Sequence, residues 1–409
     1  MLIIKRFECF KMKIGIVTVT YVNNFGSHLQ TFALQQTIRT MGFQTEIISP
    51  KGLSKEISKR RYAYLLSRLY DFNELKSYSS VLKIKIAQRL DRGFGRALRQ
   101  RGLKFVSFAE KEYSFSPITT SWEELSSLCR QYSAVVIGSD QNWRPANIAG
   151  GYYTIEYVPD DINKVAYSTS FGISRVIPAQ KEKAKYFLSR INHLSVREDS
   201  GRRIIKDLIN RDVPVVCDPT LLLTKSEWVH YIETESQTDL TDIVKSSYIL
   251  CYFLGENPMH RQFAKKLRDK TGYKIVTILL GEERYYKEKE DCYDMSVSYI
   301  GPLDFVNLIS HAKYVCTDSF HGCAFSLLFQ KELFAFYKSS TNSKMSVNDR
   351  LDSMLGWAGV KNRIIKDDVE ITDSLLEPID YEVVEKRIEE KREMSMQFLR
   401  ESLQLNLVK

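Results

Sequence analysis

The sequence predicts an α/β protein made of two Rossmann-like domains that face each other across a cleft. Short β-branched runs alternate with segments of helical period through most of the 409 residues, and this alternation is typical of parallel sheets covered by helices. A basic helical stretch interrupts the alternation once, and a second α/β set begins near residue 246. In paired α/β domains of this kind we expect the ligand between the sheets, at the carboxyl ends of the strands.

The first α/β set begins with a strand, a polar loop, a helix and a second strand. Residues 14–20 and 44–49 are short β-branched runs, and residues 28–41 between them place apolar side chains near helical spacing. Residues 51–110 predict two or three basic amphipathic helices, which we interpret as an insertion. Further strands are expected at 134–139, 164–170, 193–198 and 213–219, with helices near 179–190 and 199–210.

The second set repeats the pattern. Strands are expected at 248–255, 274–280, 314–319 and 333–337, and helices at 257–272, 302–312, 321–330 and 348–359. One long charged helix is expected from about residue 379. We therefore predict an N-terminal domain at 1–220 that contains the basic insertion, a C-terminal domain at 221–375 and a C-terminal helix at 376–409.

Composition is that of an ordinary globular protein. Hydrophobic residues make up 44% of the chain and charged residues 27%, which excludes a disordered or fibrous protein. No apolar run approaches the roughly 20 residues of a membrane-spanning helix, and the first residues show no signal-peptide pattern, so we expect a cytoplasmic protein. The seven cysteines include no CxxC pair. We therefore expect reduced thiols and no metal site.

The excess positive charge is confined to one segment. Residues 51–104 hold 15 Lys and Arg against 4 Asp and Glu, a net charge of +11, so the rest of the chain sums to −2. Tyr, Leu and Ile lie between these basic residues at helical spacing, a pattern that suits an anionic membrane surface. A solvated basic face would look the same. Nucleic acid is a further alternative, but no nucleic-acid-binding motif accompanies the charge.

The motif TDSFHG at 317–322 ends one predicted strand and opens a helix. Backbone N–H groups at such a helix N-terminus suit a phosphate or a carboxylate, and His321 could supply a proton donor. Asp318 and Ser319 are candidate substrate-binding residues in the same motif. They could equally cap the helix, with His321 in a purely structural role.

Three further motifs place polar residues after predicted strands. SVRE at 195–198 puts Arg197 where it could bind a carboxylate or phosphate in a bidentate manner, although a surface pair with Glu198 or helix capping is the alternative. NNFGS at 23–27 offers a tight turn with close backbone approach at Gly26, next to a helix N-terminus that favours anions or hydroxyl-rich ligands, although an ordinary βα turn is the alternative. GSDQNW at 138–143 puts Asp140 where it could accept sugar hydroxyls, act as a base or cap a helix.

The sequence lacks two common signatures, one for dinucleotide binding and one for nucleotide binding. Neither GxGxxG nor GK[ST] occurs, so a nicotinamide or P-loop protein is not supported. Trp143, in the motif around Asp140, could stack on a sugar or pack in the core.

Taken in order, these motifs resemble the polysaccharide pyruvyl transferase family. The similarity rests on NNFGSHLQTFALQ, GSDQNW, SVRE, YVCTDSFHG and NDRLDSMLGWAG, and it extends from about residue 14 to 360. The resemblance implies a GT-B-like fold and transfer of the enolpyruvyl group of phosphoenolpyruvate onto two saccharide hydroxyls. The products would be a pyruvate ketal and phosphate. Phosphoenolpyruvate would be the donor substrate, and no cofactor is implied.

The resemblance also implies partners and a place of action. The acceptor would be a lipid-linked saccharide or a growing surface polysaccharide, such as a capsule or exopolysaccharide. The enzyme would then act in the cytoplasm, peripherally at the inner face of the membrane, with the basic segment on anionic lipid. A GT-B-like glycosyltransferase that uses a nucleotide sugar stays open as the alternative.

By resemblance, the motif residues take roles. His321 would be the acid/base or a phosphate ligand, and Arg197 a clamp on phosphoenolpyruvate. Asn24, Gly26 and Asp140 would line the acceptor side. Well-studied members carry an arginine two residues before the histidine, where this chain has Ser319. Either another cation takes its place or the donor differs; the candidates for that cation are Arg350, Lys344 and Arg144.

Overall fold

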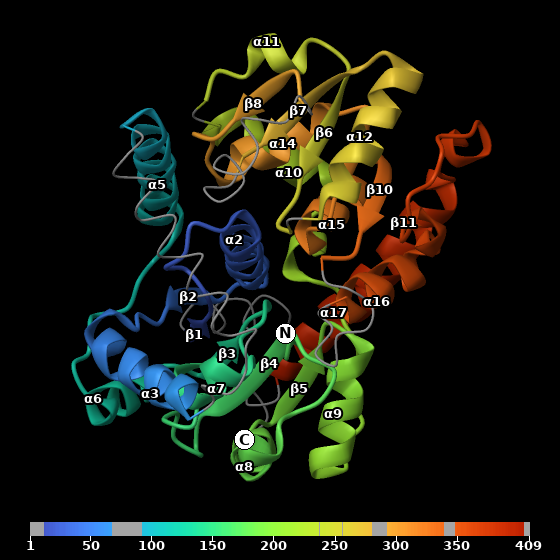
Figure 1. Ribbon diagram of the computed structural model, residues 1–409. Helices are drawn as coiled ribbons and strands as arrows, with labels where there is room; N and C mark the ends of the chain where they lie inside the picture. The colour runs from blue at the N-terminus through green and yellow to red at the C-terminus, as the bar shows by residue number, and fades with distance from the viewer. Residues whose placement is uncertain are drawn as a thin grey trace, which may run out of the picture.

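Two separate parallel sheets form the centre of the computed structural model, one in each half of the molecule (Figure 1). The structure describes residues 12–67, 92–236, 238–255, 257–279, 293–338 and 348–404. The strands of the first sheet all lie before residue 220 and those of the second all lie after it. This arrangement confirms the predicted pair of Rossmann-like, GT-B-like domains.

The first sheet has five parallel strands in the order β2-β1-β3-β4-β5. The strand runs are almost wholly buried, as expected of a sheet that is covered on both faces. The strands are β1 (Lys13–Val17), β2 (Gln44–Ile47), β3 (Ala134–Ile137), β4 (Asn163–Thr169) and β5 (His193–Val196). Their helices are α2 (Phe25–Thr40), α6 (Trp122–Cys129), α7 (Pro145–Gly150), α8 (Lys181–Ser189) and α9 (Asp199–Ile209). Sequence reasoning missed α6 and α7.

The second sheet has six parallel strands in the order β11-β10-β9-β6-β7-β8. The strands are β6 (Tyr248–Tyr252), β7 (Lys274–Ile278), β8 (Met295–Val297), β9 (Tyr314–Thr317), β10 (Glu332–Phe336) and β11 (Ile364–Ile365). Its helices are α10 (Lys225–Glu235), α11 (Thr241–Val244), α12 (Pro258–Thr271), α14 (Pro302–His311), α15 (Phe320–Leu328) and α16 (Asp349–Ala358). The short strands β8 and β11 and the helices α10 and α11 were not predicted.

The strand expected at 213–219 does not form. Only a single bridge joins Val215 to Val196 at the edge of the first sheet. Pro214 has no backbone N–H to donate to a ladder, so pairing cannot extend towards the N-terminal side of Val215. The chain instead turns at Asp218 into a short 3-10 helix, Pro219–Leu221.

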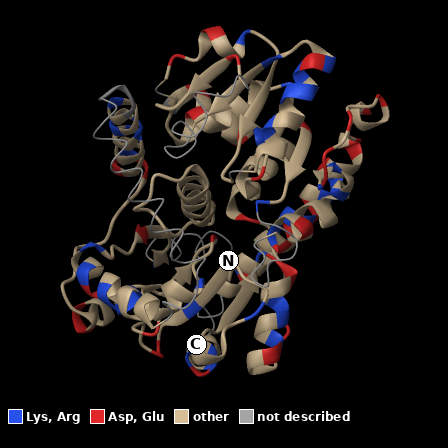
Figure 2. Ribbon diagram, in the orientation of Figure 1, with Lys and Arg blue, Asp and Glu red and all other residues tan. Residues whose placement is uncertain are grey.

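The basic segment contains α3 (Ser54–Leu66) and α5 (Arg92–Glu112), and the residues between 68 and 91 lie outside the described part. Lys and Arg gather along both helices (Figure 2). The charge is not a uniform outer surface, however. Arg101 is buried and donates to the carbonyl oxygen of Leu279 in the other domain, at 3.2 Å. Lys104 pairs with Asp304, at 3.5 Å, also across the domain boundary.

The long helix α17 (Tyr381–Gln404) confirms the predicted C-terminal helix and ties the two domains together. It runs from the C-terminal domain down onto the N-terminal one (Figure 1). The hydroxyl of Ser395 accepts from the backbone N–H of Cys217 at 2.9 Å, and the Asn163 amide donates to the carbonyl of Ser402 at 2.7 Å. One hydrophobic core runs through both domains and includes side chains of α17. The domain boundary near residue 220 therefore stays a prediction.

The buried His28 should make the protein sensitive to mild acid. Its ring lies among Phe105, Phe108 and Tyr113, and Nε2 lies 3.1 Å from the carbonyl oxygen of Val22. Burial lowers the pKa of His28 to about 4, against about 6.5 in the unfolded chain. The unfolded state therefore binds the proton first, and stability is lost as the pH falls from about 6.5 towards 4.

We expect the free energy of unfolding to fall by about 2 kcal/mol between pH 7.5 and 5 through His28 alone. Urea unfolding at the two pH values measures it. The variant His28→Gln cannot take up the proton, so its loss over the same interval should be smaller by that amount. Equal losses in the two proteins would contradict the assignment to His28.

A candidate active site between the two domains

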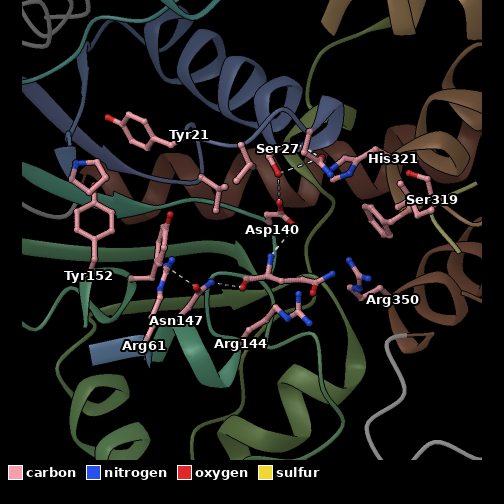
Figure 3. Close-up of a pocket in the computed structure, with 18 of the residues that line it drawn as sticks. Tyr21, Ser27, Arg61, Asp140, Arg144, Asn147, Tyr152, Ser319, His321 and Arg350 are labelled. Atoms are coloured by element: carbon pink, nitrogen blue, oxygen red, sulfur yellow. Dashed lines mark hydrogen bonds between the residues drawn. The ribbon is translucent and has the colours of Figure 1, made fainter. Parts of the chain in front are cut away.

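A cavity of about 810 Å³ lies between the two domains and is lined by residues of both. The N-terminal domain contributes the segments that follow β1 and β3, together with α3. The C-terminal domain contributes the N-terminal turns of α15 and α16. These segments follow the carboxyl ends of parallel strands, which is where open α/β sheets bind their ligands. The close-up in Figure 3 shows the side chains that line it.

His321 reaches the cavity from the first turn of α15 and rests on the opposite domain. Ser319 caps the helix, because its hydroxyl accepts from the backbone N–H of Gly322 at 3.2 Å. Nε2 of His321 lies 3.5 Å from Oδ2 of Asp218. A Cβ built on Gly26 would lie 1.9 Å from Nδ1 of the same ring. Gly26 is needed for this close approach and not for a tight turn, since it lies inside α2.

Asp140 lies at the centre of the cavity wall as a charged carboxylate. Its Oδ2 accepts from the Ser27 hydroxyl at 2.6 Å and its Oδ1 from the backbone N–H of Gln141 at 2.8 Å. Burial alone would raise its pKa, but the charges of Arg197 and His321 and the Ser27 hydrogen bond hold the pKa below its usual value. The residue has a φ of 81°, in the left-handed region that strains a non-glycine backbone. Asp140 can therefore accept a proton or hydroxyl hydrogen bonds at neutral pH.

Arg197 does not line the cavity. It lies one layer behind, where Nη1 donates to Oδ2 of Asp218 at 2.8 Å and the guanidinium stacks 4.3 Å from the Phe320 ring centre. Nη2 lies 3.7 Å from Asp140. Glu198 is also buried, with Oε2 4.0 Å from Arg197 Nε, so the expected alternative of a surface pair is wrong. The structure thus places Arg197 as a group that holds carboxylates.

Asp218 is the residue of this cluster that sequence reasoning missed. It is fully buried, and it accepts from Arg197 and Ser139 through Oδ2 and from Thr220 through Oδ1. Although burial raises the pKa of a carboxyl group, the charges of His321 and Arg197 and these hydrogen bonds hold the pKa of Asp218 well below its usual range. A permanent negative charge therefore lies between the two cationic candidates. The sequence signal that could have revealed it is an acid directly after a strand-like run, VPVVCD.

The other candidate substrate residues combine capping with a place in the cavity wall. Asn24 caps α2, accepting from the backbone N–H of Ser27 at 3.0 Å. Asp318 accepts from the backbone N–H groups of Leu254 and Gly255 at 2.6 and 2.8 Å, and burial raises its pKa. Asn24, Asp318 and Ser319 all line the cavity as well. At these positions a structural role and substrate binding are therefore compatible.

Several cations line the cavity. Arg350 and Arg144 do so on the side of His321 and Asp140, whereas Lys344 lies outside the described residues. Burial and the nearby charge of Arg197 lower the pKa of Arg350 to about 10, which leaves it charged at neutral pH. The remaining lining cations, which sequence reasoning did not place here, are Lys51, Arg61 and Lys338.

Two further expectations can be placed. Trp143 is fully buried against Phe171 and Phe187, so it packs in the core and does not face a sugar. Within the described ranges, no cluster of His, Cys, Asp and Glu has the arrangement of a metal site.

The comparisons with known proteins identify one family. Residues 24–340 match the family model described as polysaccharide pyruvyl transferase. No curated protein sequence matches the chain.

Several solved structures are similar in overall fold. The UDP-N-acetylglucosamine 2-epimerase of Rickettsia bellii is 11% identical over 97% of each chain, with a TM-score of 0.49. A glycosyltransferase of Rickettsia africae is 12% identical over 97% of each chain, with a TM-score of 0.47. The E. coli heptosyltransferase WaaC is 12% identical over 93% of this chain and 100% of its own, with a TM-score of 0.39.

Proposed function

The chain belongs to the polysaccharide pyruvyl transferase family, and on that premise we propose that it transfers the enolpyruvyl group of phosphoenolpyruvate onto two hydroxyls of one saccharide. The main observation in support is that one cavity holds both cationic or proton-donating side chains and an ionised carboxylate. His321, Arg350 and Arg144 offer cationic or proton-donating groups, and the ionised Asp140 lies among them. The phosphate and the carboxylate of phosphoenolpyruvate need the cationic and proton-donating groups, and an attacking hydroxyl needs the carboxylate of Asp140 as a proton acceptor.

The residues suit a balanced sequence of steps. C3 of the enol gains a proton and C2 becomes electrophilic. One acceptor hydroxyl forms a bond to C2, the bond from C2 to the phosphate oxygen breaks, and a second hydroxyl closes the ketal. Of the two protons that the hydroxyls release, one balances the proton gained by C3 and one leaves with phosphate.

Each group then has a place in these steps. His321 gives the proton to C3 or to the departing phosphate, and Asp140 accepts a proton from the attacking hydroxyl. Arg350 and Arg144 hold the donor anion, in the role of the arginine that is missing at position 319. Arg197 does not contact the substrates in this proposal; it is a positioning residue that holds Asp218 and Asp140 in place.

Ligand-induced stabilisation tests the donor. Phosphoenolpyruvate should raise the melting temperature, and Arg350→Gln should reduce that rise, because a ligand that binds only the folded state stabilises it. Stabilisation by a nucleoside diphosphate instead would favour the alternative, a nucleotide-sugar glycosyltransferase. Incubation with phosphoenolpyruvate and a panel of lipid-linked saccharides, followed by mass spectrometry, would then identify the ketal product.

We also infer that the acceptor is lipid-linked and that the enzyme meets it on anionic lipid. None of the described helices is long and apolar enough to cross a membrane. Basic residues lie along α3 and α5 (Figure 2), and several of them are exposed. On α3 the side chains of Tyr62 and Leu66, at 58% and 45% exposure, lie near them. Basic residues near anionic lipid contribute about 1 kcal/mol each, and apolar neighbours can insert.

Replacing four exposed basic residues by Gln should release the protein from anionic vesicles. The four are Lys55, Lys59, Arg96 and Arg99. Binding should also weaken with salt, because exposed charges are screened beyond roughly 8–10 Å at physiological ionic strength. Vesicle sedimentation measures both effects.

A control removes the same charge elsewhere on the surface. The corresponding Gln variant of Lys181, Lys185, Lys386 and Arg400 should still bind. Equal binding of the unaltered protein to neutral and anionic vesicles would refute the electrostatic attraction.

A further inference from the structure

We infer that the acceptor carries an anionic group, a phosphate or a carboxylate, and that Lys51 and Arg61 bind it at the end of the cavity formed by α3. This inference rests on the proposed function and adds the chemical class of the second substrate. It starts from the shape of the cavity. Figure 3 shows Arg61, Asn147, Tyr21 and Tyr152 on one side of Asp140, and His321, Ser319 and Arg350 on the other.

The α3 end of the cavity is positively charged. Lys51 precedes α3, and one stripe of that helix, Ser54, Ile57, Ser58 and Arg61, faces the cavity. Of the lining residues that the structure describes, the carboxylates are Asp140 and Asp318, and both belong to the central and opposite parts. The acid of α3 itself, Glu56, turns away to accept from the Trp122 indole at 2.7 Å and from Arg60 at 2.6 Å.

Arg61 is held in place by neutral groups. Its Nη2 donates to the amide oxygen of Asn147 at 2.7 Å, and its guanidinium lies 5.9 Å from the centre of the Tyr153 ring. Both contacts orient the guanidinium without neutralising it. Its Nε is buried and makes no hydrogen bond. A charged donor held in this way can bind an anion at little further ordering cost.

The donor cannot occupy both cationic ends. Phosphoenolpyruvate carries its phosphate and carboxylate on neighbouring atoms of a three-carbon unit, so both charges lie next to the reacting C2. With C2 beside His321, these charges fall to Arg350 and Arg144. Arg61 lies on the other side of Asp140 from His321, as does Tyr21 (Figure 3), and the Lys51 cation lies 6.0 Å from the centre of the Tyr21 ring. We expect the acceptor hydroxyls to reach Asp140 from this side. The anion at that end therefore belongs to the acceptor.

The surface beside Lys51, on the α3 side of Asp140, suits a sugar ring. Tyr21 lines the cavity with 42% of its surface exposed, and its hydroxyl lies 2.9 Å from the Ser49 hydroxyl, which fixes the ring. An exposed aromatic face packs well against a sugar ring, and the cation of Lys51 lies 6.0 Å from the centre of the Tyr21 ring. A saccharide over Tyr21 would thus direct hydroxyls to Asp140 and an acidic substituent to Lys51 and Arg61.

Calorimetric binding of three matched sugars tests the inference. The probes are galactose 1-phosphate, galacturonate and methyl β-galactoside. The double variant Lys51→Gln/Arg61→Gln should weaken binding of an anionic probe by about ten-fold or more, and leave the methyl glycoside unaffected. Lys55→Gln/Lys59→Gln is the matched control, because it removes the same charge from the outer face of the same helix.

The outcomes distinguish a carrier phosphate from an acidic sugar as the source of the anion. They also distinguish failure of this inference from failure of the proposed function. Preference for the 1-phosphate points to the phosphate of a lipid carrier, and preference for galacturonate to an acidic sugar. The inference is overturned if the wild type binds the methyl glycoside as tightly as both anionic sugars. It is also overturned if binding of the anionic sugars is unchanged in the double variant, or in the exposed single variant Lys51→Gln. Stabilisation by phosphoenolpyruvate should survive in all these variants, and its absence from the wild type would count against the proposed function instead.

Discussion

Replacing His321 by alanine should lower turnover by about 100-fold or more while the protein stays folded. The ring lies in the cavity wall, 3.5 Å from the buried Asp218 carboxylate. Its loss removes the group that gives a proton to the donor, and no other histidine lines the cavity among the described residues. Phosphate release from phosphoenolpyruvate in the presence of acceptor measures the rate. Near-normal turnover of a stably folded His321→Ala protein would rule out the catalytic role.

A companion variant tests the same geometry from the other domain. A Cβ on Gly26 would lie 1.9 Å from Nδ1 of His321, so Gly26→Ala must displace the ring. We expect a loss of turnover comparable to that of His321→Ala. Ala33, on the same helix, is buried away from the cavity, and Ala33→Gly serves as the control for a change within α2. Retained activity in Gly26→Ala would show that the position of the ring is not critical.

Replacing Arg197 by alanine should destabilise the protein by about 3–5 kcal/mol. The guanidinium is buried among Asp218, Asp140 and Glu198, and these charges raise the pKa of Arg197 although burial opposes it. Without it, buried carboxylates lose their compensating charge. Urea unfolding measures the loss. Arg197→Lys should restore only part of it, because an ammonium group cannot reproduce the planar contacts to Asp218 and the Phe320 ring.

The second readout separates this positioning role from a direct donor contact. A clamp on phosphoenolpyruvate would raise the KM for the donor and leave stability nearly unchanged. A positioning residue should instead lower kcat, since Asp140 and Asp218 lose their orientation, and the variant Asp218→Asn should share this kinetic effect. If Arg197→Ala stays stable and only the KM for phosphoenolpyruvate rises, the positioning role is wrong and Arg197 contacts the donor directly, as the sequence suggested.

The sequence predicted the sheets well because strands that are buried on both faces of a parallel sheet are continuous apolar runs. Runs such as 134–137 and 248–252 are apolar throughout and end at turn residues. It predicted the cavity because polar residues after such runs must gather at one edge. It failed at 213–219, where the valines predict a strand, although Pro214 lacks a donor for the ladder and the chain turns into a 3-10 helix at Asp218. The carboxylate that lies between His321 and Arg197 was hidden in that same run.

Burial and tertiary neighbours explain the other errors. An arginine after a strand has the same local sequence whether it meets a ligand or a buried acid, so the layer in which Arg197 lies could not be predicted. The basic segment was interpreted by its net charge, and this average concealed that one stripe of α3 faces the cavity and that Arg101 is buried between the domains.

The course of α17 has a consequence for how the protein forms during synthesis. Domains usually fold from the N-terminal end as the chain emerges from the ribosome. Here Ser395 and Ser402 accept hydrogen bonds from Cys217 and Asn163 of the first domain, and both serines are translated only after the whole second sheet. We therefore expect the surface of the nascent N-terminal domain that α17 later covers to stay exposed to chaperones and to other nascent chains until α17 itself has been translated.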